Sequence, residues 1–277
     1  MLPTWSRRNS IPIALTAVAL LLGAAACGAR DPQTDAEKLA RGREIVERMD
    51  AKLAGAKAFS VHTSEARTQV RPSGRSEEVK TARDIIVRRP DRLHFKVAGG
   101  QDAEAWYDGV GLTLALHKQK VFGQSRMPET LDRALDAIQE RYGVSLPIGD
   151  LLYSSPAKAL LTDSTQGGWA GRETLNGVAT DHVAFTDRGV EWALWVPSAG
   201  DPVPTRLVAT FPHNKRLRHV DVTFSSWNFS PEAPDKVFDA SVPADYEGIA
   251  MIQRASVLAN SPDAPSPEPP PTPKSKE

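Results

Sequence analysis

The residues that could support nucleophilic or metal chemistry are one cysteine, Cys27, and six histidines. The histidines fall singly in separate predicted strands and turns, and none belongs to an H-E-x-x-H pattern, so spacing does not bring metal ligands together. The G-x-S-x-G turn that presents an activated serine does not occur either. We therefore expect no enzyme, no metal site and no cofactor, and each histidine to be an ordinary strand residue. The histidines are His62, His94, His117, His182, His213 and His219.

The charge balance argues against nucleic acid as a partner. The chain has 34 basic and 34 acidic residues, whereas a nucleic-acid-binding domain has a basic surplus and clustered Lys and Arg. One basic cluster, Lys215, Arg216 and Arg218, lies at a predicted turn and is interpreted as a solvated loop. Contact with an anionic headgroup is the alternative.

The N-terminus has the features of a secretory signal peptide over residues 1–26. Arg7 and Arg8 precede an apolar run of about a dozen residues, which is too short to span a membrane. Small residues then precede Cys27, an arrangement that resembles a bacterial lipobox, in which the cysteine is acylated and becomes the mature N-terminus. Ala24 stands where that pattern usually has leucine, so an ordinary signal-peptidase site with an incidental Cys27 is the alternative.

The flanking segments predict how the chain is anchored. Residues 27–35 read as a lipidated tether, and Gly28, in place of an acidic residue, favours the outer membrane. Residues 256–277 contain a proline-rich run without large apolar residues and are expected to be a disordered tail. The folded domain is therefore expected over residues 36–255, on the periplasmic face of the cell envelope.

Periodicity within this domain predicts an α+β fold. A capping box, Thr34 with Glu37, begins an amphipathic helix that ends near Gly55. Period-two alternation follows in roughly ten strands joined by hairpins, including turns at Asp108-Gly109 and Asn176-Gly177. Helical spacing returns between residues 128 and 161, with Pro128 expected in a first helical turn and Gly143 at its end. One large antiparallel sheet of this size must curl, and the helices are available to cover its inner face.

Several longer stretches carry a family resemblance. RRPDRLHF (88–95), AWYDGVGLTL (105–114), the helical insertion at 128–156 and FSSWNFSPEAPDKVFDASVP (224–243) occur in an order that resembles an uncharacterised family of predicted periplasmic proteins. That family is similar to the LolA/LolB lipoprotein-carrier superfamily. The resemblance covers about residues 36–252 and implies a half-open antiparallel barrel, closed by helices around an apolar cavity.

The apolar residues of the inner face are the candidate ligand site. Aromatic rings offer large contact areas in such a pocket, although each ring taken alone is more often core. Trp192 and Trp195 must face opposite sides of one strand, because they are three residues apart. Tyr153, Trp169 and Trp227 are further aromatic candidates. The predicted ligand-contacting set is Leu93, Phe95, Val97, Trp106, Leu112, Leu114, Trp192, Leu194, Phe211 and Phe224.

Two functions remain open at this point. The first is a non-enzymatic envelope lipoprotein, anchored to the membrane through its N-terminal lipid, that holds an acyl chain, lipid or other apolar ligand in the half-barrel. The second is a lipoprotein that binds or senses an envelope protein partner through exposed strand edges and has no dedicated ligand.

Overall fold

The computed structural model describes residues 30–251, apart from positions 72, 101, 144–147, 163, 165, 188 and 215–216. The predicted signal peptide, Cys27 and the proline-rich tail lie outside the described residues. No helix within the described part of the chain is long and apolar enough to cross a membrane.

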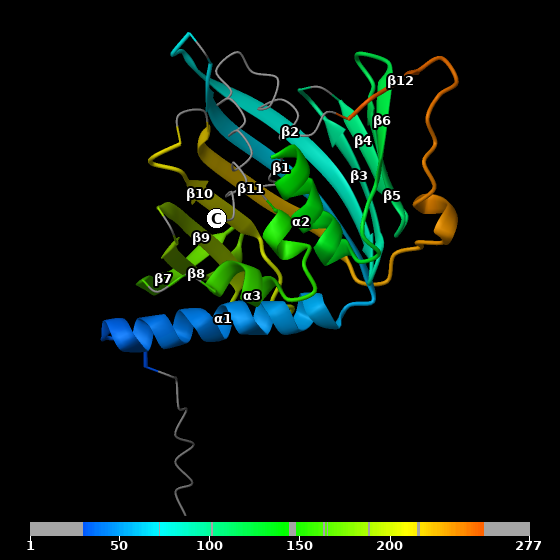
Figure 1. Ribbon diagram of the computed structural model, residues 1–277. Coiled ribbons are helices and arrows are strands. Elements are labelled where there is room, and N and C mark those ends of the chain that lie inside the picture. Colours follow the sequence, from blue (N-terminus) through cyan, green and yellow to red (C-terminus); the bar gives the residue numbers. More distant parts are fainter. Residues whose placement is uncertain are drawn as a thin grey trace, which may run out of the picture. The chain divides into compact units, whose positions relative to one another are not determined.

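Twelve strands form one curled, open sheet, and few helices accompany it (Figure 1). Neighbouring strands are antiparallel, except that β12 runs parallel to β6. The sheet order is β12-β6-β5-β4-β3-β2-β1-β11-β10-β9-β8-β7, so β12 and β7 are its two ends and the sheet does not close into a barrel. The predicted α+β class with a large curled sheet is confirmed. The strands are β1 (Ala58–Val70), β2 (Ser76–Arg88), β3 (Arg92–Ala98), β4 (Ala103–Tyr107), β5 (Gly111–Leu116), β6 (Val121–Arg126), β7 (Gln166–Leu175), β8 (Val178–Asp187), β9 (Val190–Pro197), β10 (Arg206–Thr210), β11 (Leu217–Asn228) and β12 (Glu247–Ile249).

Two strand meanders meet at the centre of this sheet. Strands β1 to β6 lie side by side in sequence order, and so do β7 to β11. The two meanders are joined by the pairing of β1 with β11, whereas β6 and β7 are not neighbours. The chain must therefore travel from β6, near one edge, to β7, at the other edge. The helical insertion makes this connection. It comprises α2 (Leu131–Tyr142), the 3-10 turn η1 (Gly149–Leu151) and α3 (Pro156–Leu161), and a second 3-10 turn, η2 (Asp235–Val237), precedes β12.

The long N-terminal helix, α1 (Asp35–Gly55), begins as the sequence predicts. Thr34 accepts from the Glu37 backbone N–H, and the Glu37 carboxylate accepts from the Thr34 backbone N–H, which completes the capping box. These bonds lower the pKa of Glu37. The helix buries Ile45, Val46, Met49 and Leu53 completely against the sheet and α3.

Two details of the predicted elements were wrong. The helix expected from Pro128 starts at Leu131, because Thr130 caps it by accepting from the Arg133 N–H, while Gly143 ends it in the left-handed conformation as expected. About ten strands were expected, and β6 and β12 raise the number to twelve. Strand β6 interrupts its apolar alternation with Gly123, and β12 is three residues long, so neither shows a strong period-two pattern.

Candidate ligand site on the concave face

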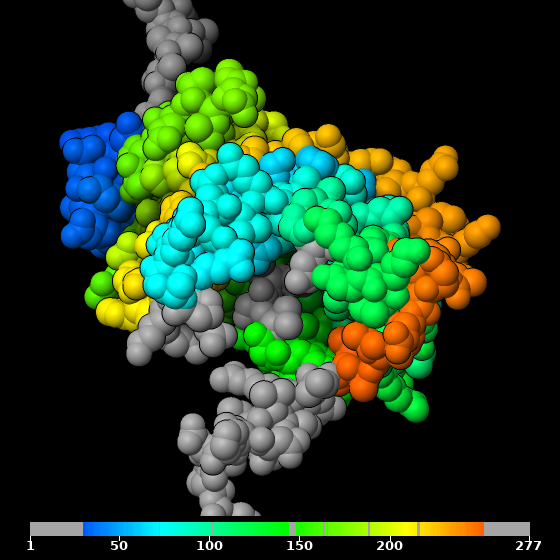
Figure 2. Space-filling view, turned by 90° about the horizontal axis from the view of Figure 1, so that it is seen from above, coloured from blue at the N-terminus to red at the C-terminus, as the bar shows by residue number. Residues whose placement is uncertain are grey.

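Strand register lines up apolar side chains in rows across the concave face. One row consists of Phe59, Val87, Leu93, Tyr107 and Leu112, which are successive cross-strand partners on β1 to β5. The next row, two residues further along each strand, is Val61, Ile85, Phe95, Ala105 and Leu114. Both rows lie in the main hydrophobic core, except that Phe95 and Leu114 are partly buried and pack against it. Figure 2 shows this side as a hollow between the cyan strands and the green insertion.

A small cavity of about 90 Å³ remains between these rows and α2, and its wall is apolar. The helix contributes Leu131, Ala134, Ile138 and Tyr142 to the wall. At one side of the cavity the Tyr107 hydroxyl donates to the Pro128 carbonyl oxygen over 2.5 Å, which ties the sheet to the start of α2. Burial, followed by the charge of Asp91, raises the pKa of Tyr107 to about 12. The remaining wall residues are Leu93, Phe95, Ala105, Tyr107, Leu112, Leu114 and Met251.

A larger cavity of about 260 Å³ lies on the other side of α2, against β9 and β10. Ile138 lines both cavities, so α2 separates them. Trp192, Leu207 and Phe211 form part of the apolar wall, and Asp150 contributes a carboxylate. Desolvation against this wall, and then the charge of Asp187, raises the pKa of Asp150. The cavity therefore combines an apolar interior with acidic groups in its wall.

The structure brings most of the predicted ligand-contacting residues onto this face. Leu93, Phe95, Leu112 and Leu114 line the smaller cavity. Trp192 and Phe211 line the larger cavity, together with Tyr153. Leu194 and Phe224 are core residues that line neither cavity, and Val97 is a partly exposed residue of the same face, opposite Arg83.

Trp106 is the exception, because it lies on the opposite, convex face. It pairs with His94 and stacks on that ring with a centroid separation of 5.6 Å, whereas its neighbours Ala105 and Tyr107 point into the core. Trp195 also lies on the convex face, where it stacks on His182. The expectation that Trp192 and Trp195 point to opposite sides therefore agrees with the structure.

The other two aromatic candidates have structural contacts of their own. Trp227 packs with Phe59, Phe224 and Phe229 in an aromatic cluster. The Trp169 indole N–H donates to the Asp181 carboxylate over 3.2 Å.

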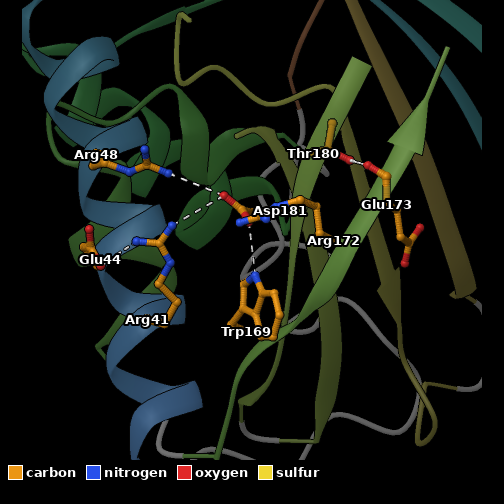
Figure 3. A network of polar contacts seen from close by, with 8 residues as sticks. All are labelled: Arg41, Glu44, Arg48, Trp169, Arg172, Glu173, Thr180 and Asp181. Carbon is orange, nitrogen blue, oxygen red and sulfur yellow. Dashed lines mark hydrogen bonds and ion pairs between the residues drawn. The ribbon is translucent and has the colours of Figure 1, made fainter. Parts of the chain in front are cut away.

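Asp181 is the centre of a buried polar network that holds α1 against β8 (Figure 3). Its side chain is fully buried, and the guanidinium groups of Arg41 and Arg48 lie 3.7 and 3.8 Å from the carboxylate oxygen Oδ2. Arg172 lies 3.4 Å from the other oxygen. A buried carboxylate needs such partners to remain charged. We interpret the network as structural, because its charged groups face one another within the fold.

Five of the histidines have local side-chain partners, and His219 lies 3.3 Å from Thr210 Oγ1. His62 contacts Asp84, His182 contacts Glu173, and both His94 and His117 contact Glu104. Among the described residues, no group of three or more His, Cys, Asp or Glu side chains is arranged to hold a metal ion.

Sequence reasoning missed the residues that α2 contributes to both cavities. Their spacing identified the apolar side of a helix, but only the fold shows that Ala134 and Ile138 border empty space. Tyr107 was missed for a related reason, since a strand tyrosine gives no local signal for its bond to Pro128.

Residues 42–252 match the family described as "Predicted periplasmic protein (DUF2092)". The chain belongs to this family. The match spans both meanders and the insertion, and it confirms the predicted resemblance to a family of predicted periplasmic proteins. No curated protein matches the sequence of this DUF2092 chain.

The solved structures that a structural comparison finds have low sequence identity to the DUF2092 chain. An uncharacterised conserved protein from Thermus thermophilus is 11% identical, with 76% of this chain and 98% of that chain covered and a TM-score of 0.46. The match to the Pseudomonas aeruginosa MucA/MucB complex has 12% identity, covers 76% of this chain and 64% of that chain, and has a TM-score of 0.43. The match to a LolA superfamily protein from Nitrosomonas europaea has 12% identity, covers 72% of this chain and 98% of that chain, and has a TM-score of 0.36. Similarity at this level does not bear on what the chain binds.

Proposed function

We propose that this DUF2092 chain is a non-enzymatic protein of the cell envelope that binds an acyl chain, lipid or other apolar ligand on the concave face of its sheet. In this proposal Cys27 is acylated and tethers the domain to the outer membrane on its periplasmic side. The family description as periplasmic and the lipobox-like residues before Cys27 support the location.

The observation that carries the proposal is the pair of cavities on either side of α2. A folded core is normally packed with few voids larger than a water molecule. Here about 260 Å³ and about 90 Å³ stay open beneath one amphipathic helix, with largely apolar walls. An apolar cavity of roughly 150 Å³ binds benzene, and drug-sized ligands need roughly 300 to 1,000 Å³. The larger cavity therefore fits a compact apolar group as it stands, and a long acyl chain requires α2 to move.

The contacts of α2 with the sheet are few enough for such a movement. Besides the Tyr107 to Pro128 bond, the Leu131 backbone N–H donates to the Pro90 carbonyl oxygen over 2.9 Å. The Tyr142 hydroxyl donates to Ser125 Oγ over 2.7 Å, and the Arg141 guanidinium donates to the Arg126 carbonyl oxygen. The buried residues of α2 are two leucines and two alanines. Alanines bury little area, so this interface binds less tightly than a leucine-rich one.

Native mass spectrometry of protein purified from its own envelope, with extraction and analysis of the co-purified lipids, tests the proposal. We expect a bound apolar ligand. Ala134→Leu fills the smaller cavity and should reduce co-purified ligand several-fold, while Ala51→Leu, the same substitution at an exposed position of α1, should leave it unchanged. Ligand-free wild-type protein would contradict ligand binding, and equal loading of Ala134→Leu would exclude the smaller cavity.

Partner binding through open strand edges has less support from the structure. The outer side of β6 is paired with β12, and β7 packs along α1. Cross-linking in the envelope followed by identification of a stoichiometric protein partner tests this alternative, and a partner without co-purified lipid would favour it.

A further inference from the structure

Beyond the apolar rows, the concave face becomes polar on β1 and β2, whereas the flanking strands β3 and β11 stay apolar there. Continuing along β1 and β2 from Val61 and Ile85, the next inward-facing positions carry Thr63 and Glu65 on β1, and Arg83 and Thr81 on β2. Thr63 is the cross-strand partner of Arg83, and Glu65 is the partner of Thr81. All four residues are less than a tenth exposed. We call these four residues the polar patch.

The charges of the polar patch are arranged around Glu65. Its Oε2 lies 2.6 Å from Arg83 Nη1, and its Oε1 lies 2.9 Å from Nε of Arg67, the next inward-facing residue of β1. One carboxylate thus lies between two guanidinium groups, which leaves a net charge of one positive unit. Two guanidiniums offer up to ten N–H donors between them, far more than one carboxylate accepts.

The two threonines add hydroxyl groups that the fold does not use. Neither the Thr63 nor the Thr81 hydroxyl has a hydrogen-bond partner among the residues that the structure describes, although Thr63 is 0% and Thr81 7% exposed. Buried polar groups are normally satisfied, because an unpaired one is costly. Two unused hydroxyls beside surplus guanidinium donors are suited to an oxygen-rich acceptor.

The polar patch is next to the apolar cavity. Phe95, Ala105 and Leu114 border the smaller cavity, and Ile85 is the cross-strand partner of Phe95 in the same row. Arg83 follows Ile85 in the adjacent inward row. Two residues along a strand correspond to about 7 Å. On β1 and β2 the concave face therefore changes from apolar to polar and cationic within one step, as the surface of an amphipathic ligand does.

From this arrangement we infer that the ligand of the concave face is an amphiphile with an anionic headgroup, a carboxylate or a phosphate, and that the polar patch with Arg67 binds this headgroup. The inference rests on the proposed function and specifies its ligand class. A cationic headgroup would be repelled by the net positive charge. An uncharged alcohol would engage the hydroxyls but would leave that charge without a counterion.

Three ligands with the same tail separate headgroup recognition from tail binding. Hexadecanoate, hexadecanol and hexadecylamine are titrated into the full-length mature protein, and their dissociation constants are compared below their aggregation limits. We expect hexadecanoate to bind at least ten-fold more tightly than either of the other two. Adding lysophosphatidate with a hexadecanoyl tail then shows whether a phosphate or a carboxylate is preferred, and either preference supports the inference.

Isosteric variants place this preference at the polar patch. Thr63→Val with Thr81→Val removes the two unused hydroxyls without changing volume, and should weaken hexadecanoate binding about ten-fold. Arg67→Gln, at the more exposed edge, should abolish the preference for hexadecanoate over hexadecanol. Thr113→Val is the control, because Thr113 is a similarly buried threonine on the convex face whose hydroxyl accepts from Gln124.

The outcomes distinguish this inference from the proposed function. Equal binding of all three ligands, or unchanged hexadecanoate binding by both variants, would overturn the anionic headgroup and leave apolar ligand binding intact. Failure of all the ligands to bind would overturn both.

Discussion

The helix α1 approaches the sheet closely where Gly42 crosses Gly168 of β7, and the substitution Gly42→Ala tests this contact. A Cβ atom at Gly42 would lie 2.6 Å from both Cα and C of Gly168 and 2.8 Å from the Trp169 backbone nitrogen. These are backbone atoms, which cannot rotate away as the end of a side chain can. Either the helix or the strand must therefore shift, near the contacts of Arg41 and Arg48 with Asp181 on the neighbouring strand β8.

The magnitude follows from two opposing effects. Alanine is favoured over glycine inside a helix by about 1 kcal/mol, and overpacking of a tight contact costs about 1–3 kcal/mol. Because the obstructing atoms are backbone, we take the upper end of this range and expect a net loss of about 2 kcal/mol of unfolding free energy. Gly55 in the last turn of the same helix has no atom within 4 Å of its would-be Cβ, so Gly55→Ala should be neutral or stabilise by about 0.5 kcal/mol.

Urea unfolding followed by tryptophan fluorescence measures both variants. Trp169 adjoins the contact, so its emission reports on local displacement as well as on unfolding. If Gly42→Ala is as stable as Gly55→Ala with an unchanged urea dependence, the close packing of α1 on β7 is refuted.

Three further predictions address the other contacts. Asp181→Asn removes the buried carboxylate that faces Arg41 and Arg48. Because these arginines are partly exposed, we expect the unfolding free energy to fall by about 2 kcal/mol, which is below the range for fully buried pairs. As a control, Glu44→Gln should change the unfolding free energy by less than about 0.5 kcal/mol. Because the pKa of Tyr107 is raised, its hydroxyl stays protonated to a higher pH in the folded state than in the unfolded state. This stabilisation of the folded state is present below pH 10 and is lost as the pH rises toward 12. Tyr107→Phe should therefore remove this part of the loss of stability at alkaline pH, measured by unfolding. Cys27→Ser should leave the precursor unprocessed or the mature domain unanchored, as membrane fractionation and the mass of the N-terminus would show, and an unmodified thiol at Cys27 of the wild-type protein would contradict the proposed anchor.

The elements set by local residues could be predicted from the sequence. The Thr34 cap, the Asn176-Gly177 hairpin and the stop at Gly143 depend on neighbours within a few positions. The pairing of β1 with β11 could not be predicted in the same way, because it joins strands from the two ends of the domain. Without that pairing, the route of the insertion across the sheet is also undetermined.

The sequence itself contains a signal that places Trp106 on the outer face of the sheet. Trp106 alternates with Ala105 and Tyr107 and therefore shares a side of β4 with the charged Glu104. A charged partner on the same side indicates the outer face, and in the structure Glu104 contacts His94, the residue on which Trp106 stacks. The size of the tryptophan side chain favoured an inner position, but strand parity decides which face a residue takes.

In the proposed function, ligand binding and the position of α2 are coupled, and the sheet order explains why. Strands β6 and β7 are near opposite edges of the sheet, so the segment between them has to cross a face, and it crosses the concave one. Ile138 then borders both cavities, and neither cavity can extend into the other while α2 stays in place. A ligand that reaches from the larger cavity into the smaller one must break the Tyr107 to Pro128 or the Tyr142 to Ser125 bond as it displaces the helix. The affinity for a long tail is therefore reduced by the free energy with which α2 packs on the sheet, and a short tail that fits one cavity does not incur that cost.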